Sequence, residues 1–389
     1  MKKKIAILGS TGSIGKTLIN ILKKDIKNFE IVLLSANQNI LELEKQVDLF
    51  DVKNLIVTDK KNYLKIKSIK KFKKKNIFNN FLSINKIFKQ KIDYVMCSIS
   101  GIEGLRPTIQ IIKYTKKIAI ANKEAIICGW NIIENELYKN KTEFIPIDSE
   151  HFSINYALNK INKKNIENIF LTASGGPLKD LPLSKFKSIT IKDALKHPNW
   201  KMGKKISIDS ATMMNKVFEI IEAHNIFNIP YKKLKILIHP KSYVHAIIKF
   251  NDGMIKIIAH DTSMTIPIYN SIYFDNSKFL NTKKLNVNNL NNLNLSKVDS
   301  KRFPLVKILL KQNDKNSLFE TIIVAANDEL VNLFLNRKIR FTEISKKLLK
   351  FINLNEFKKY KNITAKNIEC IEKLNKYVRI KINKLYIYK

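Results

Sequence analysis

Short apolar runs rich in β-branched residues alternate with helical patterns through the first 150 residues. The strands that this alternation predicts lie at residues 4–8, 30–34, 54–58, 93–97, 117–121 and 143–147, with helices from about Ile14 and over 41–50. Such alternation is typical of βαβ units, in which parallel strands are connected by helices that cover the sheet. We therefore expect an α/β fold that opens with a mostly parallel sheet. The lysine-rich interval 60–91 shows no clear period, and we interpret it as solvated helix and loop.

The pattern changes near Ser149. We expect a helix over 151–161, a strand over 168–174 and a helix after Ser210. Three further strands are predicted at "KILIHP", "YVHAIIKF" and "MIKIIAH", and Asn251-Asp252-Gly253 between the last two is a strong hairpin signal. The second sheet should therefore be at least partly antiparallel.

After an asparagine-rich connector over 281–297, apolar residues return at i, i+3 and i+4 spacing, which predicts a small helical region. The complete expectation is a Rossmann-like parallel-sheet domain, an α+β catalytic domain, a linker and a C-terminal helical bundle. The expected bounds are 1–148, 149–278, 279–298 and 299–389.

The chain carries 71 Lys and Arg against 33 Asp and Glu. These lysines are spread along the whole sequence and interleaved with Ile and Asn, which indicates a compositional bias and not a nucleic-acid site. Three cysteines without paired spacing indicate free thiols in a reducing compartment. No apolar stretch approaches the roughly 20 residues of a membrane span, and "MKKK" leads directly into a strand. We expect a cytoplasmic protein without signal or transit peptide, and neither nucleic acid nor membrane as a partner.

Three glycines follow the first strand in "GSTGSIG" (9–15). Glycine allows a tight turn and a close backbone approach, so that a pyrophosphate can sit on the N-terminus of the next helix. The G-x-x-G-x-x-G spacing differs from the common G-x-G-x-x-G and leaves the path of the loop open. We interpret the segment as a dinucleotide-binding loop, and a glycine-rich turn that only packs is the alternative.

No carboxylate follows the second strand, where the chain reads "LSANQN" (34–39). An NAD enzyme usually has an acid there for the ribose hydroxyls, and its absence favours NADP. Polar clusters at Asn122–Glu124 and Asp148–Glu150 follow two other strands. Because ligands of open α/β sheets bind at the carboxyl ends of the strands, we expect these clusters and the glycine loop to share one cleft.

Asp148 and Glu150 end an apolar run, where an Asp or Ser also commonly caps a helix. A third carboxylate, Glu219, is available on the helix over 211–224. Lys216 beside it could equally make a surface ion pair of little energy. Three carboxylates without Cys or His suit a hard divalent ion such as Mg²⁺ or Mn²⁺. We interpret the three acids as a cation site.

A second group of side chains offers hydroxyl, amide and ammonium donors. Its members are Ser174, Gly175, Gly176, Ser210, Asn215 and Lys216. Such a set suits a phosphate monoester. His197 and Trp200 lie between glycine and proline punctuation, as in a mobile lid; for His197, an ordinary surface-loop histidine is the alternative.

Eight motifs together resemble a known family. In chain order they are "GSTGSIG", "ANKE", "PIDSEH", "LTASGGP", "HPNWKMG", "ISIDSATMMNK", "LIHPKS" and "AAN" (325–327). Over nearly its whole length the chain closely resembles the 1-deoxy-D-xylulose 5-phosphate reductoisomerases of the non-mevalonate isoprenoid pathway. The resemblance implies rearrangement and NADPH-dependent reduction of 1-deoxy-D-xylulose 5-phosphate to 2-C-methyl-D-erythritol 4-phosphate. It also implies a divalent cation (Mn²⁺, Mg²⁺ or Co²⁺), a flexible flap over about 174–204, and a homodimer.

The resemblance also assigns roles to individual residues. The implied metal ligands are Asp148, Glu150 and Glu219. The implied substrate contacts are Lys123, Ser149, Glu150, Ser174, His197, Trp200, Ser210, Asn215, Lys216 and Glu219. The implied NADPH contacts are Thr11, Gly12, Ser13, Ile14, Asn37, Gln38, Asn39, Asn122, Glu124 and Gly203. Lys123, Glu150 and His197 are the expected catalytic residues. No sequence feature identifies a unique proton donor or acceptor, and Lys123, Glu150 and a metal-bound water are all candidates.

The chain departs from the family pattern in two places. Asn37-Gln38 stands where a glycine and a basic residue are usual, and "MTIP" (264–267) replaces Met-Arg-Thr-Pro. Two rival interpretations remain. A plain NADP dehydrogenase of the homoserine type gives no reason for three carboxylates beside a phosphate pocket. A basic nucleic-acid-binding protein conflicts with the diffuse charge.

Overall fold

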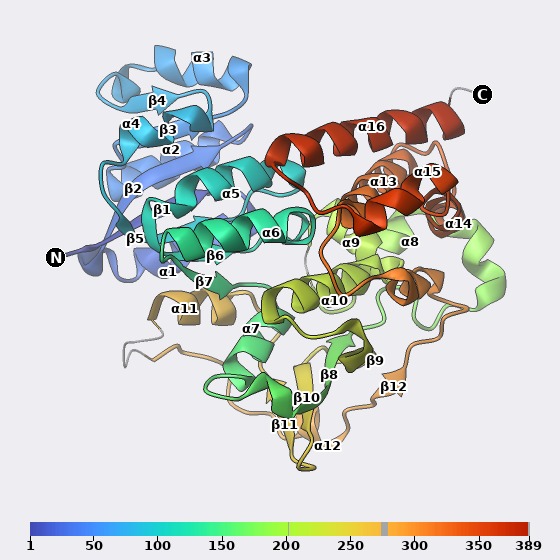
Figure 1. The fold of residues 1–389 in the computed structure, drawn as a ribbon. Helices are drawn as coiled ribbons and strands as arrows, with labels where there is room; N and C mark the ends of the chain where they lie inside the picture. Colours follow the sequence, from blue (N-terminus) through green and yellow to red (C-terminus); the bar gives the residue numbers. More distant parts are fainter. Residues whose placement is uncertain (201, 274–278, 388–389) are drawn as a thin grey trace. The chain divides into compact units, whose positions relative to one another are not determined.

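The computed structural model describes residues 1–200, 202–273 and 279–387, and it divides into two compact units (Figure 1). Unit 1 comprises Met1–Ala125, Ile132–Phe152 and Ser263–Asn281. Unit 2 comprises Ile126–Asn131, Ser153–Thr262 and Thr282–Lys389. The expected domain bounds follow chain order instead and stay a prediction. Residue 201 of the expected flap and residues 274–278 of the expected second domain lie outside the described residues.

Unit 1 contains a parallel sheet of order β4-β3-β2-β1-β5-β6-β7. Its strands are β1 (Lys3–Leu8), β2 (Phe29–Ala36), β3 (Asn54–Val57), β4 (Asn76–Phe78), β5 (Ile92–Cys97), β6 (Thr115–Ile120) and β7 (Glu143–Pro146). The expected parallel α/β sheet is thus confirmed. The strand order reverses between β1 and β5, which is where open α/β sheets bind their ligands.

Helices connect these strands. They are α1 (Ser13–Lys23), α2 (Ile40–Phe50), α3 (Lys60–Ser68), α4 (Ile84–Ile87), α5 (Leu105–Ile112) and α6 (Lys123–Lys139). The core of unit 1 forms where the apolar faces of α1 and α2 meet the fully buried middle of β1. Burial of this face, and not helix propensity alone, stabilises short helices such as these.

The interval 60–91 contains a strand that the sequence interpretation missed. Besides α3 and α4 it forms β4, which pairs with β3 through Asn54 and Asn76 at the edge of the sheet. β4 has three residues, too few to show an alternating period. The prediction of helix and loop alone was therefore wrong here.

One helix returns to unit 1 from late in the chain. α11 (Thr265–Tyr273) buries Ile268 and Ile272 in the unit 1 core. The Ser271 hydroxyl lies 2.8 Å from the Tyr94 hydroxyl, and the Tyr273 hydroxyl donates to Asp25 at 2.8 Å. These contacts explain why a segment that follows the unit 2 strands in sequence packs with the first sheet.

Unit 2 contains a mixed sheet of order β11-β10-β8-β9-β12. Its strands are β8 (Ile166–Ala173), β9 (Leu234–Ile238), β10 (Val244–Phe250), β11 (Ile255–Ala259) and β12 (Ser296–Lys297). β8 and β9 are parallel and the other pairs antiparallel, which confirms the partly antiparallel sheet and the β10–β11 hairpin. The expected connector is not featureless, because it forms β12 and the short α12 (Asn288–Asn291).

The helices of the second half include α7 (Ser149–Ala157), α8 (Ile191–Leu195), α9 (Lys204–Ala211), α10 (Met214–Phe227), α13 (Leu318–Leu335), α14 (Phe341–Phe351), α15 (Asn355–Lys358) and α16 (Ile368–Tyr386). α13 packs against both α14 and α16, drawn in orange and red in Figure 1. Within the described residues, no helix is both long and apolar enough to span a membrane.

The helix expected over 211–224 begins later than predicted, at Met214, and a separate helix, α9, precedes it. Ser210 lies in the last turn of α9, and Met213 then takes a left-handed conformation (φ 65°) before α10 begins. The Thr212 hydroxyl donates back to the Ile208 carbonyl at 3.1 Å, which helps to end α9. An apolar residue with positive φ leaves no sequence signal, because Gly or Asn is usual there.

Candidate functional site

The glycine loop between β1 and α1 requires glycine at two positions. Gly9 has φ +84°, and a Cβ there would lie 2.9 Å from the backbone of Ser98. A Cβ on Gly15 would lie 2.5 Å from the Gly9 carbonyl oxygen. Among the residues described, no side chain caps α1 at Gly12. The loop therefore holds backbone N–H groups at a helix N-terminus open to a phosphate, and Thr11, Ser13 and Ile14 lie in the same turn.

The carboxyl end of β2 supports this loop. The buried Ser35 accepts a hydrogen bond from Gly9 N at 2.8 Å through its hydroxyl, and its carbonyl accepts from Ser10 N at 2.9 Å. Sequence reasoning included Ser35 in the run "LSANQN" but did not predict that it would hold the glycine loop. This hydroxyl fixes the path of the loop that the glycine spacing left open.

The three residues predicted to select the cofactor are exposed at the end of β2. The Asn37 amide donates to the Thr58 hydroxyl at 2.8 Å, which ties the ends of β2 and β3 together. Asn39 caps α2 by accepting from Glu42 N at 3.1 Å. Gln38 lies between them. This edge therefore presents amides and hydroxyls where an NAD enzyme usually presents a carboxylate.

The residues after β6 form the start of α6. Asn122 is 4% exposed; its oxygen accepts from Ala125 N at 2.9 Å and its nitrogen donates to the Gly101 carbonyl at 2.7 Å. Both ends of this amide are thus engaged within unit 1, joining the loops that follow β5 and β6. Glu124 beside it is buried as well.

Lys123 and Asp148 bring the ends of β6 and β7 together. The Lys123 ammonium lies 2.7 Å from Asp148 Oδ2, with the two side chains 11% and 18% exposed. Ser149 N donates to Asp148 Oδ1 at 3.0 Å, and the Ser149 hydroxyl donates to Glu150 Oε2. Asp148 also lies directly before α7. Its position is therefore compatible with both interpretations that the sequence allowed, a residue at the start of a helix and a member of a charged cluster.

In unit 2, Ser174 and His197 meet at the end of β8. His197 Nε2 lies 3.1 Å from the Ser174 hydroxyl, which also accepts from Gly176 N at 3.0 Å. His197 Nδ1 accepts the backbone N–H groups of Asn199 (3.2 Å) and Trp200 (3.0 Å). Burial lowers the pKa of His197 to about 4. The ring is therefore neutral near pH 7 and carries its proton on Nε2.

The loop after Ser174 approaches the end of α9 closely. Gly176 has φ +68°, and a Cβ there would lie 2.8 Å from the Ser210 carbonyl oxygen. Ser174, the Gly176 backbone, His197 and Ser210 are thus held in one part of unit 2. Of the six residues predicted as anion donors, Ser174, Gly176 and Ser210 thus lie together, and their role in binding an anion stays a prediction.

α10 supplies the remaining charged residues of unit 2. Lys216 is 4% exposed and Glu219 1% exposed. Lys216 pairs with one oxygen of Glu219, and the Asn215 amide donates to the other. The alternative of a surface ion pair was therefore wrong. A buried carboxylate needs such partners to remain ionised.

The segment around Trp200 is anchored in this structure. The Asn199 amide donates to the Pro240 carbonyl at 2.7 Å and to the Ser242 hydroxyl at 2.8 Å. The Trp200 ring meets the His245 ring edge-to-face at 6.4 Å. Sequence reasoning missed Asn199 and Ser242. Gly203 is the residue directly before α9 and has open space where a Cβ would stand.

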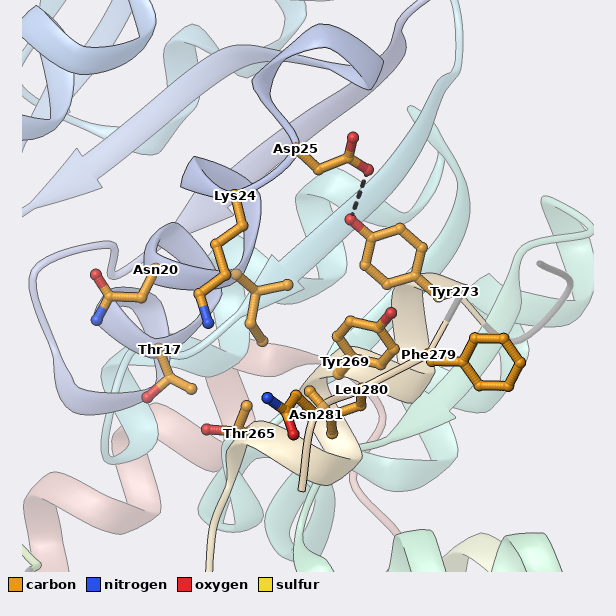
Figure 2. Close-up of a pocket in the computed structure, with 11 residues that line it drawn as sticks. Thr17, Asn20, Lys24, Asp25, Thr265, Tyr269, Tyr273, Phe279, Leu280 and Asn281 are labelled. Atoms are coloured by element: carbon orange, nitrogen blue, oxygen red, sulfur yellow. Dashed lines mark hydrogen bonds between the residues drawn. The ribbon is translucent and has the colours of Figure 1, made fainter. Parts of the chain in front are cut away.

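A cavity of about 410 Å³ lies elsewhere in unit 1, between α1 and α11 (Figure 2). Figure 2 shows Lys24 and Tyr269 at its wall and the hydrogen bond from Tyr273 to Asp25. None of the predicted site residues lines it. The cavity is separate from the predicted cofactor loop.

A glycine loop at the switch point of a parallel sheet, together with a separate unit rich in anion donors, defines a dinucleotide-dependent α/β enzyme. Three family models match the chain: "1-deoxy-D-xylulose 5-phosphate reductoisomerase" over residues 5–129, the C-terminal domain of that name over 144–227, and "DXP reductoisomerase C-terminal domain" over 261–381. A curated relative of that name from Pelagibacter ubique is 59% identical over 387 residues, covering 99% of this chain and 100% of the relative. The chain belongs to the 1-deoxy-D-xylulose 5-phosphate reductoisomerase family.

Solved structures agree with this assignment. A reductoisomerase of the same name from Zymomonas mobilis, in complex with NADPH, has a TM-score of 0.89 at 27% identity and covers 100% of both chains. A second reductoisomerase, in complex with NADPH, fosmidomycin and magnesium, has a TM-score of 0.89 at 26% identity over 98% of each chain. The predicted family and fold class are confirmed, and the plain dehydrogenase and nucleic-acid interpretations are set aside.

Proposed function

We propose that the residues described above carry the reaction of the family in this chain. The chain is an NADPH-dependent reductoisomerase that converts 1-deoxy-D-xylulose 5-phosphate to 2-C-methyl-D-erythritol 4-phosphate for isoprenoid precursor synthesis. The observation that carries the residue assignment is the cluster of Ser174, the Gly176 backbone, His197 and Ser210, because this set of donors suits a phosphate monoester.

NADPH belongs at the carboxyl edge of the unit 1 sheet. The fit rests on the glycine loop, where a Cβ on Gly9 or Gly15 would meet backbone atoms and where backbone N–H groups are free for a pyrophosphate. When bound, NADPH supplies the hydride for the reduction. Asn37, Gln38 and Asn39 accommodate the 2′-phosphate because they carry no charge that would repel it. Thr11, Gly12, Ser13, Ile14, Asn122, Glu124 and Gly203 complete the proposed contacts, and Asn122 acts chiefly by holding its loop.

A divalent cation is proposed to bind the carboxylates of Asp148, Glu150 and Glu219. Oxygen ligands of this kind suit Mg²⁺, Mn²⁺ or Co²⁺, and such an ion supplies Lewis acidity toward substrate oxygens. Each carboxylate is oriented by a neighbour in its own unit: Asp148 by Lys123, Glu150 by Ser149, and Glu219 by Asn215 and Lys216. This orientation supports the ligand assignment.

The substrate phosphate is proposed to bind Ser174, Ser210, Asn215, Lys216 and His197. The His197 ring contributes a neutral Nε2–H donor, because its Nδ1 accepts from the backbone. Phosphate binding far from the reacting carbons supplies energy for closing the flap over about 174–204, with Trp200 covering the substrate and excluding water. Lys123, Ser149 and Glu150 contact the reacting end, where Lys123 and Glu150 are the candidates for proton transfer.

The assembly and location are also proposals. We place the enzyme in the bacterial cytoplasm and expect it to be a homodimer. Its small-molecule partner is the phosphorylated sugar substrate. Neither nucleic acid nor membrane is part of its function. The diffuse distribution of its lysines supports this view.

One assay tests the function. NADPH oxidation is followed with 1-deoxy-D-xylulose 5-phosphate, with and without Mn²⁺ and a chelator. We expect turnover that requires both the sugar phosphate and the cation. Absence of NADPH oxidation with folded protein and saturating Mn²⁺ would overturn the proposal, and tight salt-sensitive DNA binding would restore the nucleic-acid alternative.

A further inference from the structure

A buried carboxylate on α9 links the proposed phosphate site to the C-terminal helices. Asp209 is 1% exposed and directly precedes Ser210. Its Oδ1 accepts from the Asn327 amide of α13 at 2.8 Å, and its Oδ2 lies 3.0 Å from the Lys205 ammonium. A buried charge of this kind is costly unless paired and hydrogen-bonded, so its partners hold it in one position.

The same contacts continue into α13 and α16. Lys205 also lies 3.0 Å from Asp328 Oδ1, and Asp328 Oδ2 lies 2.9 Å from the Arg379 guanidinium. Arg379 in turn contacts Glu329 at 3.4 Å. These side chains form a continuous network from α16 through α13 to α9, and Asn327, its central amide, is fully buried.

The α9 end of this network lies beside the residues that are proposed to bind the substrate phosphate. The Ser210 carbonyl closely approaches Gly176, whose N–H donates to Ser174. The Lys205 ammonium also lies over the ring of Phe218 on α10, 5.1 Å from its centroid. A shift of α9 would therefore displace Ser210 from the Ser174 loop.

We propose that Asn327 and Lys205 are positioning residues, which through Asp209 hold Ser210 and the start of α10 in the geometry that binds the substrate phosphate. This inference rests on the proposed role of Ser210, Asn215 and Lys216 in phosphate binding. The C-terminal helices would then influence substrate affinity, although the residues in this network contact neither the substrate nor the cofactor.

The test replaces Asn327 by leucine, which removes the donor to Asp209 at nearly constant volume. The matched control is Asn332→Leu, an exposed position on the same helix. Binding of inorganic phosphate is measured by titration calorimetry without turnover, together with KM and kcat for the sugar phosphate and the dissociation constant of NADPH. Losing a hydrogen bond to a charged group should weaken phosphate binding about tenfold or more.

We expect Asn327→Leu to raise the dissociation constant of phosphate and the KM by a similar factor, with NADPH binding and the control unchanged. A folded Asn327→Leu enzyme with wild-type phosphate affinity would overturn the inference.

If this variant does not fold, Lys205→Met replaces it, and Lys205→Arg should restore phosphate binding because it keeps the ion pairs. Equal loss in both lysine variants would also overturn it. Phosphate binding is measured without turnover, so the two proposals fail in different ways. If only the proposed reaction is wrong, the wild type binds phosphate but is inactive.

Discussion

His197 Nε2 lies 3.1 Å from the Ser174 hydroxyl, while Nδ1 of the same ring accepts two backbone N–H groups. The backbone thereby fixes the tautomer, so that the ring presents an N–H and not a lone pair at the proposed phosphate site. A neutral donor can bind a phosphate without depending on the pH near neutrality. The backbone of Asn199 and Trp200 thus presets the orientation of this ring.

The first prediction concerns pH and stability. The pKa of His197 is about 4 in the folded protein, below the ordinary value of 6.5, because the ring is buried. Between these two pKa values the unfolded chain binds more protons than the folded protein, so the free energy of unfolding rises with pH. The contribution of His197 is present above pH 6.5 and is lost as the pH falls toward 4. We expect the Tm of the wild type to fall more over this interval than that of His197→Gln. An identical pH dependence in both proteins would contradict the low pKa.

The second prediction concerns the contact between Gly176 and Ser210. Gly176→Ala should raise KM for the sugar phosphate and lower stability, because it adds a left-handed Cβ penalty of roughly 1–2 kcal/mol and a clash with the Ser210 carbonyl. Gly253→Ala is the matched control: φ there is +87°, but no atom lies within 4 Å of the added Cβ. Steady-state kinetics and thermal unfolding measure both. Equal KM values in the two variants would show that the close approach does not matter.

The third prediction concerns the choice of cofactor. Asn37→Asp keeps the shape of the side chain and its place beside the Thr58 hydroxyl, but adds a carboxylate where the 2′-phosphate is proposed to bind. A carboxylate there repels the phosphate and suits a free ribose hydroxyl. We expect the dissociation constant of NADPH, measured by fluorescence, to rise about tenfold or more, equivalent to ~1.4 kcal/mol, and NADH to bind better. The exposed Asn85→Asp should change neither. Unchanged NADPH affinity in Asn37→Asp would place the 2′-phosphate elsewhere.

The parallel sheet and its ligand edge could be predicted from the sequence. Apolar runs such as that of β1, which alternate with helical patterns, identify strands by themselves, and the polar residues that follow β6 and β7 must lie at one edge if the strands are parallel. The structure confirms that Lys123 and Asp148 meet there. The glycine spacing after β1 likewise indicated a loop that admits no side chain at Gly15.

Other features depend on tertiary contacts that leave no local signal. β4 is too short to have a period and forms because β3 offers an edge. Met213 takes a left-handed conformation that its residue type does not suggest. The burial of Lys216 and Glu219 follows from the packing of α10 and not from their spacing, which also fits a surface pair. Asn327 meets Asp209 across 118 residues of chain.

The assignment of Glu219 to the cation is the central claim, and one titration tests it most directly. Mn²⁺ binding is measured by calorimetry in the wild type, in Glu219→Gln and in Asp252→Asn, which changes an exposed acid in the β10–β11 turn. We predict that Glu219→Gln keeps its fold but binds Mn²⁺ at least about tenfold more weakly (~1.4 kcal/mol) and turns over very slowly, whereas Asp252→Asn binds Mn²⁺ as the wild type does. Wild-type Mn²⁺ affinity and full activity of Glu219→Gln in saturating metal would remove Glu219 from the ligand set.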